Sequence, residues 1–246
     1  MLKTERHAYI MKQINLHNRI QSADLSSNLA VSEDTIRRDL HELATAGLIL
    51  KVHGGALSKS FHYPSQNPSY ALDAKKSIAK KAISLIKKDM VVLTGGGTTV
   101  IEMARMMPEN LEATFFTISP LVALELSDHP RLEVVLLGGK LSKTAQISIG
   151  SQVISQLSDL KADICFTGVY SLSANEGLTE SDWEVVQVKK AMIKSASKTA
   201  VLSISEKLGS VQKLRVGPIS DIDYLITEAH PEDRLLDEYR NHLQVI

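Results

Sequence analysis

VSEDTIRRDLHELATAG, residues 31–47, and HGGA, residues 53–56, decide the fold of the N-terminal part of this chain. Ser32 can cap the free N–H groups of a following helix. Ile36, Leu40 and Leu43 recur at helical spacing, which predicts one buried stripe. Gly47 predicts a left-handed stop, after which residues 48–52 alternate like a short strand.

The opposite side of this helix is polar and carries two arginines near its start. Asp34, Arg38, His41 and Thr45 lie opposite the stripe, and Arg37 lies at its flank. Adjacent arginines are often only a solvated helix face. The combination of cap, stripe, paired arginines and glycine-rich turn favours contact with DNA.

Two further helical patterns precede this segment, one over residues 3–16 and one that begins at Ser22. Three helices and a hairpin predict a winged helix-turn-helix, whose last helix enters the major groove. Either arginine can then pair with guanine or hold phosphate. His53 and Gly54 form an ordinary turn, or also approach a phosphate closely. The DNA-binding candidates are Ser32, Glu33, Thr35, Arg37, Arg38, His41, Lys51, His53 and Gly54.

Charge argues against a nonspecific binder of polyanions, because the formal net charge of the chain is zero. Residues 1–57 carry seven Lys and Arg against six Asp and Glu, a net charge of +1. One such module binds DNA weakly, so useful affinity requires paired modules on a repeated or palindromic site. We therefore expect a homo-oligomer, a dimer or a tetramer, on double-stranded operator DNA.

Composition is that of a globular protein, with 246 residues and 43% hydrophobic side chains. The sequence lacks both a run of about eighteen apolar residues and the apolar core of a signal peptide, which predicts a cytoplasmic protein without a membrane segment. Cys165 lies in a pattern typical of a buried strand. We expect no metal site and no cofactor.

A proline- and serine-rich segment separates two domains. We predict a DNA-binding domain over residues 1–57, a linker over 58–74 and an α/β domain over 75–246. In the last, strands near residues 90–93, 114–117, 133–137, 162–167, 200–203 and 223–227 alternate with helices near 75–87, 99–107, 120–126, 185–196 and 231–241. This alternation predicts a mostly parallel sheet with helices on both faces.

One loop of the second domain has the chemistry of a phosphate site. A strand leads through Gly95, Gly96, Gly97, Thr98 and Thr99 into a helix, which offers backbone N–H groups and two hydroxyls to an anion. The loop is neither a Walker loop nor a dinucleotide fingerprint. A tight turn with a threonine cap is the alternative interpretation.

Other glycine loops also follow strands, where ligands bind in parallel sheets. Gly138 and Gly139 follow one strand and Gly168 ends another, although each of these can simply make a turn. Lys207 follows a further strand and can supply a cation, although a surface lysine is the simpler interpretation.

The signature of residues 31–56, with Glu5-Arg6 upstream, resembles that of the DeoR family of bacterial sugar-operon repressors. The later order of Gly-Thr-Thr, Leu-Gly-Gly, Phe-x-Gly, Gly-Leu-Thr and a late lysine is similar to the sensor domain of that family. The resemblance implies a fold related to ribose-phosphate isomerases and a phosphorylated sugar as effector. By resemblance, Gly97, Thr98 and Thr99 hold the phosphate, and Lys207 and the other glycine loops contribute to the pocket.

The chain departs from that family at several polar positions. Gly95 and Ile204 stand where the family often has Asp, Ile118 stands where it has Asn, and Glu228 replaces a frequent Asp. These changes remove usual contacts to sugar hydroxyls, which indicates an unusual or differently held sugar phosphate.

Three functions remain open from sequence. The leading one is a repressor, not an enzyme, whose operator binding is modulated by a phosphorylated sugar. The second is a sugar-phosphate isomerase with an accessory DNA module, for which Asp163, Glu180, Asp182 and Glu184 are candidate bases by residue type. The third is an activator or a DNA-bound scaffold without a small effector.

Overall fold

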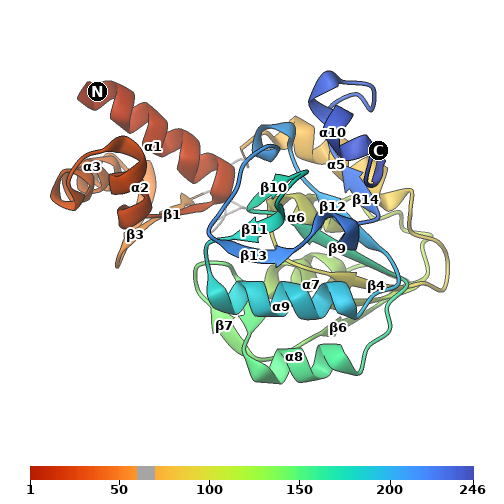
Figure 1. Ribbon diagram of the computed structural model, residues 1–246. Coiled ribbons are helices and arrows are strands. Elements are labelled where there is room, and N and C mark those ends of the chain that lie inside the picture. Colours follow the sequence, from red (N-terminus) through yellow and green to blue (C-terminus); the bar gives the residue numbers. More distant parts are fainter. Residues whose placement is uncertain (60–69) are drawn as a thin grey trace. The chain divides into compact units, whose positions relative to one another are not determined.

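The computed structural model describes residues 1–59 and 70–246, and its chain divides into two compact units, Met1–Leu72 and Asp73–Ile246 (Figure 1). Of the linker predicted over 58–74, residues 60–69 lie outside the described residues. The described helices include none that is long and apolar enough to cross a membrane.

The N-terminal unit has the predicted winged helix-turn-helix fold. The strands of this unit form an antiparallel sheet in the order β1-β3-β2, and β2 and β3 form the wing. The elements are α1 (Lys3–His17), β1 (Arg19–Gln21), α2 (Ser22–Leu29), α3 (Glu33–Thr45), β2 (Ile49–Val52) and β3 (Gly55–Ser58).

The core of this unit forms where the apolar stripes of its three helices meet. Ile36, Leu40 and Leu43 of α3 are buried, as their spacing predicts, and they pack in one cluster with Ile10 and Ile14 of α1. Because these residues lie on one side of α3, the opposite side of the helix is left to solvent.

A buried ion pair joins α1 to α3. The Arg6 guanidinium donates to both carboxylate oxygens of Asp39, at 2.5 and 2.9 Å, and Nε2 of His7 lies 3.0 Å from Oδ1 of the same carboxylate. Burial alone raises the pKa of Asp39, but the hydrogen bonds from Arg6 and His7 outweigh it, so the pKa is lowered. Asp39 therefore stays ionised and fixes α3 relative to α1.

The second unit is an α/β domain built around a parallel sheet. Its helices are α5 (Leu72–Ile83), α6 (Thr98–Arg105), α7 (Pro120–Ser127), α8 (Ser151–Ser158), α9 (Trp183–Lys194) and α10 (Asp237–Arg240). Its strands are β4 (Val91–Thr94), β5 (Ala113–Thr117), β6 (Leu132–Leu136), β7 (Lys140–Ser142), β8 (Ile147–Ile149), β9 (Ile164–Gly168), β10 (Ser171–Ser173), β11 (Gly177–Glu180), β12 (Thr199–Leu202), β13 (Leu214–Gly217), β14 (Tyr224–Ile226) and β15 (Gln244–Val245).

In the described part of the domain, the main sheet has seven strands in the order β15-β14-β12-β9-β4-β5-β6, and every neighbouring pair is parallel. From β4 the chain first winds outward through β5 to β6 and then returns to β9 on the other side of β4. The strand order thus reverses between β4 and β9. In open α/β sheets, such a reversal opens a crevice at the carboxyl ends of the two strands.

Helices cover both faces of this sheet, as predicted (Figure 1). Helices α8 and α9 pack on the face that carries Leu93 and Cys165, and α6 and α7 lie together on the other. Burial raises the pKa of the Cys165 thiol to about 12, so it behaves as a core side chain.

Several elements of this domain escaped prediction. The antiparallel pair β7–β8, helix α8 and the small antiparallel sheet β10-β11-β13 were not expected from the sequence. The helix expected over residues 231–241 is wrong in part, because the structure has a 3₁₀ turn, Arg234–Leu236, followed by the short helix α10. Short elements give too few residues for a periodic pattern to emerge.

The buried pair in the N-terminal unit generates the first prediction. Replacing Asp39 by Ala should lower the free energy of unfolding of this unit by about 1–3 kcal/mol, because it removes the charged hydrogen-bond partner of the partly buried Arg6. Hydrogen exchange of the α1 and α3 amides in the full chain measures this loss. The control is Asp34→Ala on the exposed side of α3, and equal exchange in the two variants would contradict the prediction.

Candidate DNA interface and effector site

The start of α3 is fixed by the predicted cap. The Ser32 hydroxyl accepts a hydrogen bond from the backbone N–H of Thr35 at 3.3 Å and lies 2.9 Å from the Thr35 hydroxyl. Glu33 follows in the first turn, where the positive end of the helix dipole favours an acid. Ser32 thus has a structural role whether or not it touches DNA.

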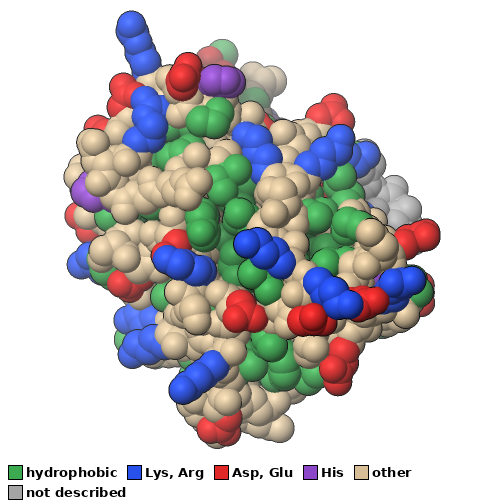
Figure 2. Space-filling view, turned by 90° about the vertical axis from the view of Figure 1, so that its right-hand side faces the viewer, with side chains coloured by type: hydrophobic (Ala, Val, Ile, Leu, Met, Phe, Trp, Pro, Cys, Tyr) green, Lys and Arg blue, Asp and Glu red, His purple; other side chains and the backbone are tan. Residues whose placement is uncertain are grey.

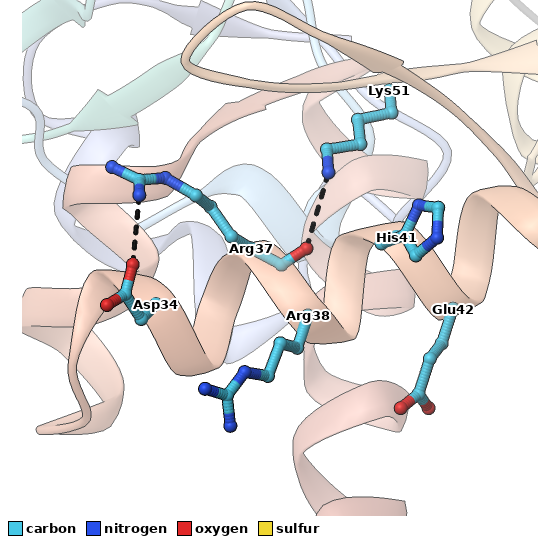
Figure 3. Close-up of a pocket in the computed structure, with 6 residues that line it drawn as sticks. All are labelled: Asp34, Arg37, Arg38, His41, Glu42 and Lys51. Atoms are coloured by element: carbon cyan, nitrogen blue, oxygen red, sulfur yellow. Dashed lines mark hydrogen bonds and ion pairs between the residues drawn. The ribbon is translucent and has the colours of Figure 1, made fainter.

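The polar side of α3 borders an open hollow of about 540 Å³ (Figure 3). Its lining combines predicted DNA-binding residues with two acids: Asp34, Arg37, Arg38, His41, Glu42 and Lys51. Lys51 comes from β2, and its Nζ donates to the backbone oxygen of Arg37 at 3.5 Å. The wing strand therefore places a third cation beside the two arginines.

The two arginines differ in their surroundings. Arg37 Nη1 donates to Oδ1 of Asp34 at 2.9 Å, and both side chains are exposed. The Arg38 side chain extends away from that pair (Figure 3), and within residues 1–59 and 70–246 it has no protein partner. Of the two arginines, Arg38 is thus the one without an ion pair to the described residues.

The glycines of the wing turn have separate tasks. A Cβ at Gly55 would lie 2.0 Å from the backbone oxygen of Ile20 on β1, so that position requires glycine for packing. Gly54 and His53 are exposed, and a Cβ at Gly54 would meet no atom within 4 Å. The turn itself is open to a nucleic acid backbone.

In the second unit, the loop after β4 lies at the point where the strand order reverses. The backbone N–H of Gly95 donates to the oxygen of Phe166 on β9 at 2.9 Å, and a Cβ at Gly168 would lie 3.2 Å from the oxygen of Gly96. Gly97 has a φ of +112° and leads into Thr98 at the start of α6. The structure thus brings together the predicted loop Gly95–Thr99 and Gly168.

The hairpin β7–β8 closes on this loop. A Cβ at Gly96 would lie only 2.5 Å from Cγ2 of Ile147 on β8. The Ser119 hydroxyl, after β5, donates to the oxygen of Gln146 at 3.4 Å. Thr98 and Thr99 are 8% and 9% exposed, so both residues are largely buried.

Gly138 and Gly139 lie elsewhere, two strands away after β6. The oxygen of Gly138 accepts from Gln156 of α8, and a Cβ at Gly139 would lie 2.9 Å from the oxygen of Ile149. Their contacts with the described residues therefore go to α8 and β8. The structure does not place them against the Gly95–Thr99 loop.

Lys207 lies next to the end of β9, one of the two strands between which the strand order reverses. Its Nζ donates to the backbone oxygen of Val169, next to Gly168, at 3.0 Å. The turn that carries it is held by Glu228, whose carboxylate accepts from both the backbone N–H and the hydroxyl of Ser205. Glu228, noted in the sequence only as a departure, therefore positions this segment.

The other departures are apolar and buried. Ile118 is 1% exposed and Ile204 is 3% exposed. They contribute no donors or acceptors through their side chains. Gly95 likewise places only backbone beside Thr167 and Met192.

Two further lysines, missed from the sequence, act on Lys207. Burial, together with the charges of Lys75 and Lys189, lowers the pKa of Lys207 to about 7, against the opposing effect of Glu180. Burial also lowers the pKa of Lys75 to about 8, against the effect of Glu102. A signal existed, because Lys75 shares a helix face with the buried Ile78 and Ala82, and Lys189 shares one with Val185 and Met192.

The outer surface differs from this interior. On the face drawn in Figure 2, Lys and Arg lie among Asp and Glu, without a broad region of one sign. This mixture agrees with the zero net charge of the chain.

A winged helix with an open cationic hollow, joined to an α/β domain with a glycine loop at its strand reversal, defines the class of two-domain transcription regulators. Comparison with known families agrees. Residues 6–61 match the DeoR-like helix-turn-helix domain, and residues 71–229 match the DeoR C terminal sensor domain. The chain belongs to the DeoR family of transcription regulators.

Curated relatives match nearly the whole chain. The HTH-type transcriptional repressor GlcR of Bacillus subtilis (strain 168) is 34% identical to this chain. The match covers 96% of this chain and 93% of the GlcR chain. The HTH-type transcriptional regulator GlpR of Haloferax volcanii is 31% identical, and the match covers 93% of this chain and 91% of the GlpR chain. The glycerol-3-phosphate regulon repressor of Haemophilus influenzae is 30% identical, and the match covers 94% of this chain and 92% of that repressor.

A solved ribose 5-phosphate isomerase A from Methanocaldococcus jannaschii is similar to part of the chain. The match covers 55% of this chain and 54% of that chain, with 21% sequence identity and a TM-score of 0.41.

The buried lysines generate the second prediction. In an NMR titration of lysine side chains, the signal of Lys207 should have its midpoint near pH 7, and that of Lys75 near pH 8. Because the folded pKa of Lys207 is lowered, the protonated form opposes folding. The free energy of unfolding should rise as pH increases from about 7 toward the unfolded lysine value of about 10.4. The variant Lys207→Gln identifies the signal, and a midpoint near 10 for Lys207 would contradict the prediction.

Proposed function

We propose that this regulator represses a sugar-metabolism operon and that a phosphorylated sugar, bound at the Gly95–Thr99 loop, modulates its affinity for operator DNA. The observation that supports this most directly is the convergence of that loop, Gly168 and Lys207 at one strand reversal. In the proposal, residues 1–57 form the domain that binds DNA and residues 75–246 form the domain that binds the sugar phosphate. Residues 58–74 are the linker between the two domains.

For the DNA side, α3 is the recognition helix and β2–β3 is the wing. Arg37, Arg38, His41 and Lys51 line the open hollow, so they are the side chains we assign to bases and phosphates. Ser32, Glu33 and Thr35 orient the start of α3, and His53 and Gly54 approach the DNA backbone from the wing. Because the module is nearly neutral, the proposal includes a dimer or tetramer that binds two half-sites.

For the effector side, the start of α6 supplies backbone N–H groups, and Thr98 and Thr99 supply hydroxyls for the phosphate. Lys207, whose Nζ donates to the oxygen of Val169 next to Gly168, adds positive charge. A coupling of about 1–3 kcal/mol between the two sites corresponds to a change in DNA affinity of about 5- to 150-fold.

The four acids proposed as isomerase bases mostly serve the fold, which favours a regulator without catalytic activity. Asp163 accepts from the backbone N–H of Val91, at the start of β4 and away from the carboxyl ends. Asp182 caps α9, and Glu184 pairs with Lys140. Glu180 opposes the charge at Lys207 and pairs with Lys189 at 2.7 Å.

The third prediction concerns the recognition helix. Arg38→Ala should weaken binding to an operator fragment, measured by fluorescence anisotropy over a range of salt concentrations. If Arg38 contacts a base, the loss is about 1–3 kcal/mol and specificity relaxes at one position; if it contacts phosphate, all sequences weaken and the salt slope falls by about 1.

The matched control for this experiment is Arg19→Ala, which removes the same charge from β1 of the same unit. Equal affinities of the Arg38→Ala variant and the unmodified chain, at every salt concentration, would contradict the placement of α3.

The fourth prediction concerns the phosphate loop. Thr98→Val and Thr99→Val should each weaken binding of a hexose monophosphate by about 10-fold or more, because a hydrogen bond to a charged group contributes about 1.5–3 kcal/mol. DNA affinity without sugar phosphate should stay unchanged. Isothermal titration measures the first quantity and anisotropy the second.

The proposal as a whole is tested by titrating sugar phosphates into the complex with DNA. We expect the DNA affinity to change only with compounds that bind the loop. A sugar phosphate that binds the loop and leaves the DNA affinity unmoved would refute the modulation.

A further inference from the structure

The last residue of β4 carries a buried hydroxyl that the fold leaves unpaired. Thr94 is 0% exposed, and its Oγ1 has no hydrogen-bond partner within residues 1–59 and 70–246. The backbone oxygen of the same residue, by contrast, accepts from the N–H of Ile118 at 3.2 Å and from the hydroxyl of Thr117 at 3.3 Å. Burying a hydroxyl without a hydrogen bond is costly, so native proteins rarely keep such a group.

Other buried hydroxyls at this end of the sheet are paired. Thr117 lies beside Thr94 in register on β5, and its hydroxyl also accepts from the backbone N–H of Ser119 at 3.1 Å. The hydroxyl of Thr167 on β9 donates to the oxygen of Gly168 at 3.1 Å. These two threonines are 0% and 2% exposed, so burial at this edge does not by itself prevent a hydroxyl from pairing.

The Thr94 side chain points to the face of the sheet that carries α6. Successive side chains of a strand point to opposite faces, and Leu93 packs with Met192 on the face covered by α8 and α9. Thr94 therefore points to the other face, where α6 and α7 lie. Gly95–Gly97 follow directly, and α6 begins at Thr98. The hydroxyl thus lies at the same end and on the same face of the sheet as the first turn of α6.

A phosphate at the start of α6 supplies the partner that this hydroxyl lacks. The first turn of a helix and the hydroxyls of Thr98 and Thr99 offer donors to an anion. A threonine hydroxyl is also a donor, and a phosphate has several acceptor oxygens. One phosphate can therefore accept from the helix start and from Thr94 together.

The loop between Thr94 and α6 allows this approach. Gly97 has a φ of +112°, and a Cβ on it would meet no described atom within 4 Å, so an anion can come close to the backbone there. Because Thr94 is fully buried, its contact with an anion requires this loop to shift. Three consecutive glycines leave the backbone free to do so.

We infer that Thr94 is a further phosphate-binding residue of the effector site, and that its hydroxyl donates a hydrogen bond to the phosphate held at the start of α6. The inference rests on the proposed function, because it assumes that the Gly95–Thr99 loop holds a phosphate. The contact is to the phosphate and not to the sugar, so it serves any phosphorylated ligand of the loop.

Two measurements on Thr94→Val separate a ligand contact from a structural role, since valine keeps the shape of threonine and removes the hydroxyl. In buffer without phosphate, the midpoint of thermal unfolding of the full chain should be unchanged or raised by up to about 4 °C, because the lost group had no partner. In calorimetric titrations, the affinities for inorganic phosphate and for a hexose monophosphate should both fall by about tenfold.

Three further variants serve as controls. Thr117→Val removes an equally buried hydroxyl that is paired, and it should lower the midpoint by about 2–4 °C. Thr114→Val removes a hydroxyl near the opposite end of β5, and both affinities should stay within about twofold. Thr94→Ser keeps the hydroxyl and should restore both affinities to within about threefold.

A midpoint lowered as much by Thr94→Val as by Thr117→Val would mean that the hydroxyl is paired within the fold, and it would overturn the inference. Affinities of Thr94→Val equal to those of the unmodified chain would also overturn it. A loss confined to the hexose monophosphate would assign the contact to the sugar and overturn the contact with phosphate. Failure of the unmodified chain to bind any phosphorylated probe overturns the proposed function itself.

Discussion

The parallel direction of every strand in the main sheet is the constraint on which the second unit depends. Parallel strands end at one edge, so the loops that leave β4 and β9 must emerge side by side once the strand order reverses between them. Gly96 and Gly168 permit the close approach that this geometry imposes. The crevice therefore follows from the topology, and the residues around it decide what it binds.

Charge is distributed very unevenly inside this domain. The face drawn in Figure 2 mixes the two signs of charge, whereas Lys75 is buried and Lys189 and Lys207 are partly buried. The same burial that lowers the pKa of Lys207 also strengthens its attraction to an anion. Strongly lowered lysine pKa values of this kind are more typical of binding sites than of elements that stabilise the fold.

The N-terminal unit balances different demands. Its apolar stripe and the Arg6–Asp39 pair fix α3 on α1, and Gly55 lets the wing pack against β1. These contacts leave Arg38 and the wing turn exposed. Rigidity on one side of the recognition helix is what allows the other side to hold its side chains ready for DNA.

The sequence by itself determined the winged helix, the parallel sheet and the Gly95–Thr99 loop, because each rests on local patterns: a cap, a stripe at helical spacing, or glycines after a strand. Tertiary structure alone decided that Gly168 and Lys207 lie beside the loop, that Gly138 and Gly139 contact α8 and β8, and that the charges of Lys75 and Lys189 act on Lys207. A lysine on an apolar helix face has no visible partner in sequence. The role of such a lysine depends on which strand ends lie next to it in the fold. The order of the strands is set by pairing between strands that are far apart in the chain.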